Sequence, residues 1–158
     1  MSIISAKSAN LIYFAVVIGL IFLGGKVLER NDARPLPGQP SMSILRDDFS
    51  AIPVPSGDVP IDQLTTFNRG GAVGVARHFR ATSPVSALLT YYENELPHHG
   101  WTLKGSSEAH GAESTIRFCK ADRSLTIDAA RGGESTMYYL GVVWTRSPND
   151  NAYCAGGR

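Results

Sequence analysis

The sequence contains little of what usually marks a catalytic or cofactor-binding protein. It has no Gly-x-Ser-x-Gly elbow, no glycine-rich phosphate loop and no His-Glu-x-x-His helix. Acidic pairs such as Asp47-Asp48 fall in a segment expected to face water, where general acid–base catalysis is improbable. We therefore predict no catalytic residue and no cofactor, and we expect the chain not to be an enzyme.

An excess of charge of one sign is also missing. From Pro35 to the end of the chain, 11 Lys and Arg stand against 12 Asp and Glu. Nucleic acid is therefore not an expected partner, because binding a polyanion requires clustered cations. His98-His99 form a neighbouring pair, but a metal site needs three or four converging ligands, and His78 and His110 cannot be placed beside the pair. We predict no metal site, and we interpret the pair as a solvated turn.

The most distinctive feature is a charge-free apolar segment near the N-terminus. Eighteen residues without a charge separate Lys7 from Lys26, and residues 11–23 form an apolar run interrupted only by Gly19. As a helix, 18 residues reach about 27 Å, close to the thickness of the hydrocarbon core of a bilayer. We predict a tail at residues 1–10 and a transmembrane anchor at residues 11–25. The alternatives are a buried core helix or a cleaved signal peptide, although no Ala-x-Ala pattern comes after the run.

Residues 26–58 are predicted to form a proline-rich linker. Prolines fix φ and remove backbone donors, which favours an extended and semi-rigid chain. The prolines concerned are Pro35, Pro37, Pro40, Pro53 and Pro55. Within the linker, residues 41–52 could form a short helical turn or dock on the domain, and the pattern leaves both open.

Residues 59–146 are expected to form one α+β domain, followed by a C-terminal tail at residues 147–158. A helix is predicted from Pro84 to about Leu96, with Ser83 as its N-cap. Its apolar side chains recur on one stripe, at Val85, Leu88, Leu89, Tyr92 and Leu96. A two-residue period predicts strands at residues 72–81, 101–103, 115–119, 125–127 and 136–145. The expected fold class is thus α+β: an N-terminal transmembrane helix, then one helix packed on a mostly antiparallel sheet of about five strands.

One short pattern in the helix and the turn after it resembles a known group of proteins. Tyr91-Tyr92, Leu96 and Gly100-Trp101 have the spacing YY-x3-L-x3-GW, which is similar to that of many uncharacterised bacterial envelope proteins and lipoproteins. The resemblance covers roughly residues 59–144 and implies an anchored α+β module of the cell envelope, with no assigned activity. The residues themselves are explained by core and turn roles.

The orientation of the anchor depends on two opposing arguments. Lys26, Arg30 and Arg34 lie after the apolar segment, whereas Lys7 and the α-amine precede it, so the positive-inside rule alone would keep the domain in the cytoplasm. Short N-terminal segments of this kind more often act as signal anchors that export the C-terminal part of the chain. We therefore expect a single-pass protein of the bacterial inner (cytoplasmic) membrane with its C-terminal domain in the periplasm or otherwise outside the cytoplasm.

These features predict a membrane-tethered interaction or accessory module of a bacterial envelope complex, without catalysis. The membrane would be contacted through residues 11–25, and the other expected partner is an envelope protein. The interface is expected at an exposed strand edge, or at Tyr138 and Trp144, which alternation places on one outward face. The alternative is a small-ligand-binding domain with an apolar pocket between helix and sheet. The oligomeric state is not encoded in any pattern that we recognise.

The two cysteines, Cys119 and Cys154, connect the fold to the compartment. An oxidising compartment would allow a disulfide between them, whereas cytosolic thiols normally stay reduced. The strand parity places Cys119 on the sheet face away from the helix, so a bridge would fold the C-terminal tail over that face. Two unpaired thiols are the alternative, and we predict the disulfide.

Overall fold

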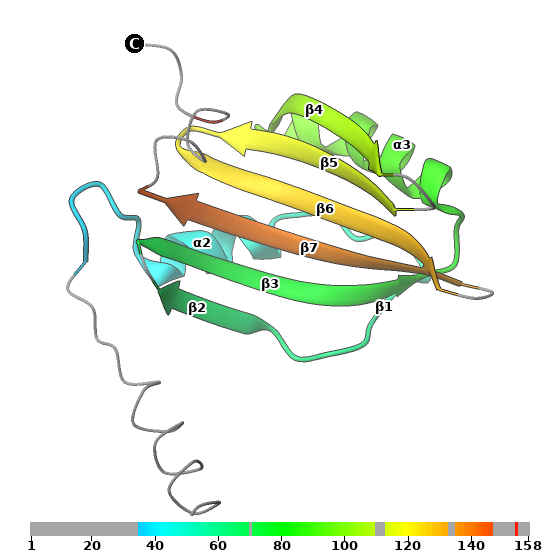
Figure 1. Ribbon diagram of the computed structural model, residues 1–158, viewed down its shortest axis with the longest axis horizontal. Helices are drawn as coiled ribbons and strands as arrows, with labels where there is room; N and C mark the ends of the chain where they lie inside the picture. The colour runs from blue at the N-terminus through cyan, green and yellow to red at the C-terminus, as the bar shows by residue number, and fades with distance from the viewer. Residues whose placement is uncertain (1–34, 70, 110–112, 133–134, 147–153, 155–158) are drawn as a thin grey trace, which may run out of the picture. The chain divides into compact units, whose positions relative to one another are not determined.

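A seven-stranded antiparallel sheet forms the body of the computed structural model, which describes residues 35–69, 71–109, 113–132, 135–146 and 154. Its strands have the spatial order β1-β3-β7-β6-β5-β4, and β2 also pairs with β3 (Figure 1). The elements in chain order are α2 (Met42–Ser50), β1 (Val59–Pro60), β2 (Thr65–Arg69), β3 (Ala72–Ala81), α3 (Val85–Glu95), the 3₁₀ helix η1 (Leu96–His99), β4 (Thr102–Ala109), β5 (Glu113–Lys120), β6 (Arg123–Gly132) and β7 (Ser135–Thr145).

The expected fold class was wrong in its number of strands and helices. The structure has seven strands where about five were predicted, and two α-helices pack on the sheet where one was predicted. β1 and β2 were missed because most of their residues are exposed and show no apolar alternation. Among the described residues, no helix has the length and hydropathy needed to cross a membrane. The predicted anchor at residues 11–25 lies outside the described part of the chain.

Helix α2 lies in the segment that was predicted to be a linker. Ser41 is its N-cap, and the Ser41 hydroxyl accepts a hydrogen bond from the Ile44 N–H at 3.4 Å. Leu45 is fully buried and Ile52, just past the helix, is 5% exposed. Both belong to the hydrophobic core that the strands and α3 share, so residues 41–52 dock on the domain.

Helix α3 buries the predicted stripe. Leu88, Tyr92 and Leu96 are fully buried, whereas Val85 and Leu89 are half-buried at its margins. The helix begins at Val85 with Pro84 as its N-cap, one residue later than expected. Glycine is needed at position 100, because φ is +80° there and the chain must reverse into β4.

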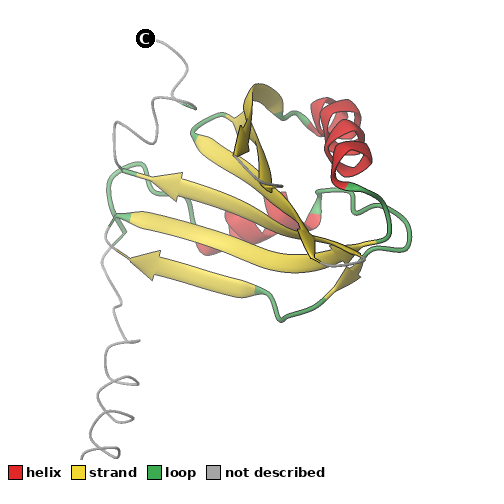
Figure 2. Cartoon of the chain, turned by 45° about the vertical axis from the view of Figure 1, so that its right-hand side comes forward, coloured by secondary structure: helices red, strands yellow, loops and turns green. Residues whose placement is uncertain are grey.

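Both helices cover the same face of the sheet. Leu45 of α2 and Leu88 of α3 share one core with the inward residues of the strands, among them Val75, Ile127 and Leu140. In Figure 1 both helices lie behind the sheet, and the turned view of Figure 2 shows no helix in front of the strands. The opposite face, which we call the open face, is therefore not covered by any described helix.

Candidate functional site

The aromatic pair that was predicted to form an outward surface lies in the core. Tyr138 is 2% exposed and Trp144 is 5% exposed. The parity argument was right that they share a face, but that face is the one covered by the helices. β7 is apolar on both faces, so its alternation could not tell the inner face from the outer one, and the predicted surface at Tyr138 and Trp144 is corrected.

Tyr138 instead belongs to a chain of buried hydroxyl groups. The Tyr92 hydroxyl donates to the Tyr138 hydroxyl at 3.2 Å, which in turn donates to Asp58 Oδ2 at 3.1 Å. Burial is the main cause that raises the pKa of both phenols. Phe79 stacks on Tyr138 with ring centroids 5.1 Å apart. This arrangement satisfies buried polar groups and holds α3 on the sheet.

The two cysteines are joined in the structure. Cys119 and Cys154 form a disulfide with their Cα atoms 5.1 Å apart, within the range that unstrained bridges require. Cys154 is 4% exposed, and its sulfur lies 3.9 Å from the Phe118 carbonyl oxygen. The bridge borders a hollow of 250 Å³ on the open face, together with Ser124 and Thr126.

A row of polar side chains, most of them titratable, crosses the open face. The strand register places His78 of β3 opposite Tyr139 of β7, Tyr139 opposite Asp128 of β6, and Asp128 opposite Thr115 of β5. Asp62 extends the row beyond β3, since its Oδ2 atom lies 2.6 Å from His78 Nδ1. Side chains from five separate segments therefore meet in one line.

Hydrogen bonds fix both ends of this row. The backbone N–H of His78 donates to Asp62 Oδ1 at 2.9 Å, and this bond and the imidazole contact hold the pKa of Asp62 below its usual range. Thr115 Oγ1 donates to Asp128 Oδ1 at 2.6 Å. Burial raises the pKa of Tyr139, and the Asp128 carboxylate adds to that effect. The row thus combines fixed donors, acceptors and an aromatic ring.

A hollow of 420 Å³ opens beside the row, and we call it the His78 hollow. Its polar lining consists of His78, Tyr139, Asp128, Thr115 and Glu113, and its apolar lining includes Met137 and Ala130. The volume falls in the range of small-molecule sites in proteins. The hollow lies on the open face, whereas the predicted apolar pocket was placed between helix and sheet.

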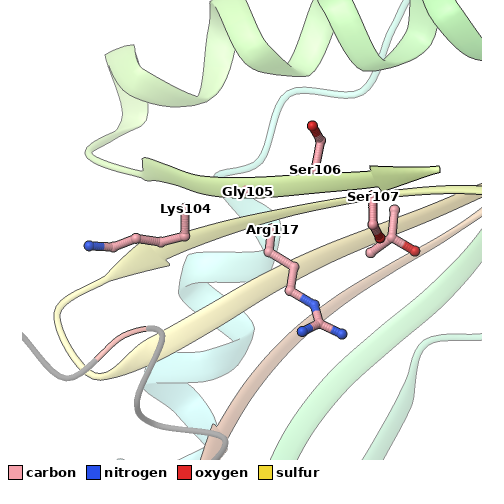
Figure 3. Close-up of a pocket in the computed structure, with 6 residues that line it drawn as sticks. Lys104, Gly105, Ser106, Ser107 and Arg117 are labelled. Carbon is pink, nitrogen blue, oxygen red and sulfur yellow. The ribbon is translucent and has the colours of Figure 1, made fainter.

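A second feature lies at the far edge of the sheet. β4 pairs with β5 on one side, and among the described strands no other pairs with it. A hollow of 230 Å³ lies at this edge, lined by Lys104, Gly105, Ser106, Ser107, Thr115 and Arg117. In Figure 3 the Lys104, Ser107 and Arg117 side chains project on one side of β4 and Ser106 on the other. We call this place the β4 edge.

The charged cluster beneath the sheet has a structural explanation. Asp48 of α2 is 8% exposed, and its carboxylate lies 3.0 Å from Lys120 Nζ and 2.6 Å from Arg123 Nε. Arg123 also lies 3.6 Å from Asp122, which accepts a 3.0 Å hydrogen bond from Trp144 Nε1. The cluster attaches α2 to the turn between β5 and β6.

Possible metal ligands do not cluster among the described residues. No group of three or more His, Cys, Asp or Glu side chains within them could hold a metal ion. His98 and His99 are exposed at the end of η1, as expected for a solvated turn. Comparisons with protein families, with curated proteins and with solved structures find no match to this chain.

The residues of the open-face row were not predicted as a site from the sequence. Asp62 and His78 are 16 positions apart, and Thr115, Asp128 and Tyr139 come from three further strands. Alternation indicates which residues share a face of one strand, but only the register between strands brings these five together. No local motif marks them.

Proposed function

We propose that this chain is a membrane-tethered interaction module of a bacterial envelope complex, without catalytic activity, and that it binds an extended segment of a partner protein at the β4 edge. The observation that carries the proposal is the unpaired side of β4 among the described strands. An edge strand presents backbone N–H and C=O groups that a second chain can pair with, and strand addition is a common mode of peptide recognition.

The side chains around β4 indicate that this edge pairs with selected strands and not with any exposed strand. The register shifts between Leu103 and Gly105, which leaves Lys104 as the extra residue of a bulge. A bulge and a lysine both limit uncontrolled edge pairing. Leu103 is 44% exposed, so an incoming strand would also cover apolar surface. Lys104 borders the hollow at this edge and favours a partner segment with an acidic side chain.

The tether is the second part of the proposal. Residues 11–25 would hold the module at the membrane, and the residues after them would lead into α2, whose position on the domain is fixed by Leu45 and Asp48. A tethered module needs little affinity of its own, because confinement to the membrane raises its effective concentration near a membrane partner.

The test compares two edges of the same sheet. A photo-crosslinking amino acid is placed at Ser107 in β4 or at Thr66 in β2 of the full chain in membranes, and crosslinked segments are identified by mass spectrometry. We expect one partner segment from Ser107 and none from Thr66. A synthetic peptide of that segment should then slow hydrogen exchange of the β4 amides, and substitution Lys104→Glu should weaken its binding. Equal crosslinking at both edges, or β4 amides that exchange as before, would contradict the proposal.

A further inference from the structure

The His78 hollow has the chemistry of a ligand site distinct from the β4 edge, although Thr115 lines the hollows at both places. Its lining comes from β3, β5, β6 and β7, and it combines an aromatic ring, an imidazole, two carboxylates and a hydroxyl group with an apolar floor. These groups lie on the open face, where the described helices leave them accessible (Figure 1). The role proposed for β4 does not use them.

The aromatic ring of Tyr139 is held in a defined position. A Cβ atom added at Gly141 would overlap the Tyr139 ring, so the ring occupies the space above Gly141 that a side chain would otherwise fill. The imidazole of His78 stands beside it, with ring centroids 5.4 Å apart and planes tilted by 59°. Because Tyr139 leans along its strand toward Gly141, room remains beside Met137, where the hollow lies. A fixed ring loses little entropy when a ligand contacts it.

The polar groups around the hollow are also positioned in advance. Asp62 holds His78 through Nδ1 and the backbone N–H, which directs the other ring nitrogen of His78 away from Asp62. Thr115 binds one oxygen of Asp128 and leaves the second oxygen to accept from a ligand. The rim therefore offers hydrogen-bond acceptors that are positioned in advance, with apolar atoms between them.

We propose that the His78 hollow binds a neutral saccharide ring, with the ring lying against Tyr139 and its hydroxyl groups bonding Asp128, His78 and Glu113. Sugar hydroxyl groups can donate to these acceptors, and the C–H face of the sugar matches an aromatic surface. Anionic ligands are disfavoured by the two carboxylates. A small cation would pair with the carboxylates but leave the apolar lining at Met137 and Ala130 uncovered.

The test uses the full chain in nanodiscs of phosphatidylcholine and phosphatidylglycerol, which contain no sugar. Saturation-transfer NMR detects binding of chitotriose and cellotriose, with trilysine as the cationic probe. We expect transfer to the sugar ring protons of at least one trisaccharide. Substitution Tyr139→Leu keeps Gly141 covered but removes the aromatic face, and should weaken binding about tenfold. Asp128→Asn, at an exposed position, should weaken it by a similar factor.

Phe67 provides the matched control. Its ring occupies the space above Gly74 as Tyr139 does above Gly141, but Phe67 does not line the hollow. Phe67→Leu should leave saccharide binding unchanged. The proposal is overturned if neither trisaccharide binds the unmodified protein, if trilysine binds in their place, or if Phe67→Leu weakens binding as much as Tyr139→Leu. Loss of partner capture at β4 would refute the proposed function without affecting this result.

Discussion

Substitution Asp48→Asn should be among the most destabilising polar substitutions in this chain. Asp48 is 8% exposed on α2 and lies between Lys120 and Arg123, whose side chains are 32% and 17% exposed. Asparagine keeps the shape of the side chain and removes its charge. The variant would therefore leave two cations facing a neutral group in a largely buried place.

The expected magnitude depends on burial and distance. Two unit charges about 4 Å apart attract by about 4 kcal/mol at the effective dielectric constant of partly buried sites. Desolvation offsets part of that attraction in the intact cluster, but removing one partner leaves the cost of the remaining charge uncompensated, typically about 3 to 5 kcal/mol. Lys120 is partly exposed and can recover solvent, so we expect about 3 kcal/mol for Asp48→Asn.

Urea unfolding monitored by tryptophan fluorescence measures this loss, because Trp101 and Trp144 are both buried in the core. Asp47→Asn is the control, since Asp47 is exposed on the same helix and should change stability by about 0.5 kcal/mol or less. The double variant Asp48→Asn with Arg123→Met should cost less than the sum of the two single variants. Equal effects at positions 47 and 48, or strict additivity, would refute the role given to the cluster.

Three further outcomes are expected. Leu88→Ala should lower the free energy of unfolding by about 2 to 5 kcal/mol and Leu89→Ala by clearly less, because only Leu88 is fully buried; equal losses in urea unfolding would contradict this. Replacing Cys119 and Cys154 by serine should cost about 3 to 4 kcal/mol in the chain-entropy model for their separation of 35 residues, and alkylation mass spectrometry before reduction should find no free thiol. Hydrogen bonds hold the pKa of Asp62 in the folded protein below its ordinary 3.8. The ionised Asp62 side chain therefore contributes fully to the free energy of unfolding above pH 3.8, and this contribution is lost as the pH falls through the folded-state pKa. In unfolding measurements at a series of pH values, an Asp62→Asn variant should lack this acid dependence.

The sequence predicted best the elements whose local pattern has one interpretation. α3 combines a proline start, a one-sided stripe and a glycine turn, and three of the five predicted stripe residues, Leu88, Tyr92 and Leu96, are fully buried. β3 was predicted at residues 72–81, the range that the structure gives. In both elements, local periodicity and tertiary burial agree, so no information from distant residues was needed.

The elements that were missed or left open owe their structure to distant contacts. α2 lies among prolines, and its Leu45 and Asp48 are explained only by the core and by the cations on β5 and β6 that they meet. β1 has two residues, and its register opposite Phe79 and Arg80 on β3 is what defines it as a strand. Intrinsic propensity gives too little signal for such segments, because tertiary pairing decides their conformation.

β7 explains why the predicted interaction surface was replaced by another one. Tyr138 and Tyr139 are adjacent, equally aromatic and indistinguishable by composition, yet Tyr138 is held in the core by Asp58 whereas Tyr139 lies on the open face above Gly141. A shift of one residue in the register would exchange them. Gly141 is the local feature that distinguishes the two tyrosines, because its missing side chain leaves space for the Tyr139 ring on the open face. In β7, the glycine two positions after Tyr139 therefore separates Tyr139 from Tyr138, which alternation alone does not.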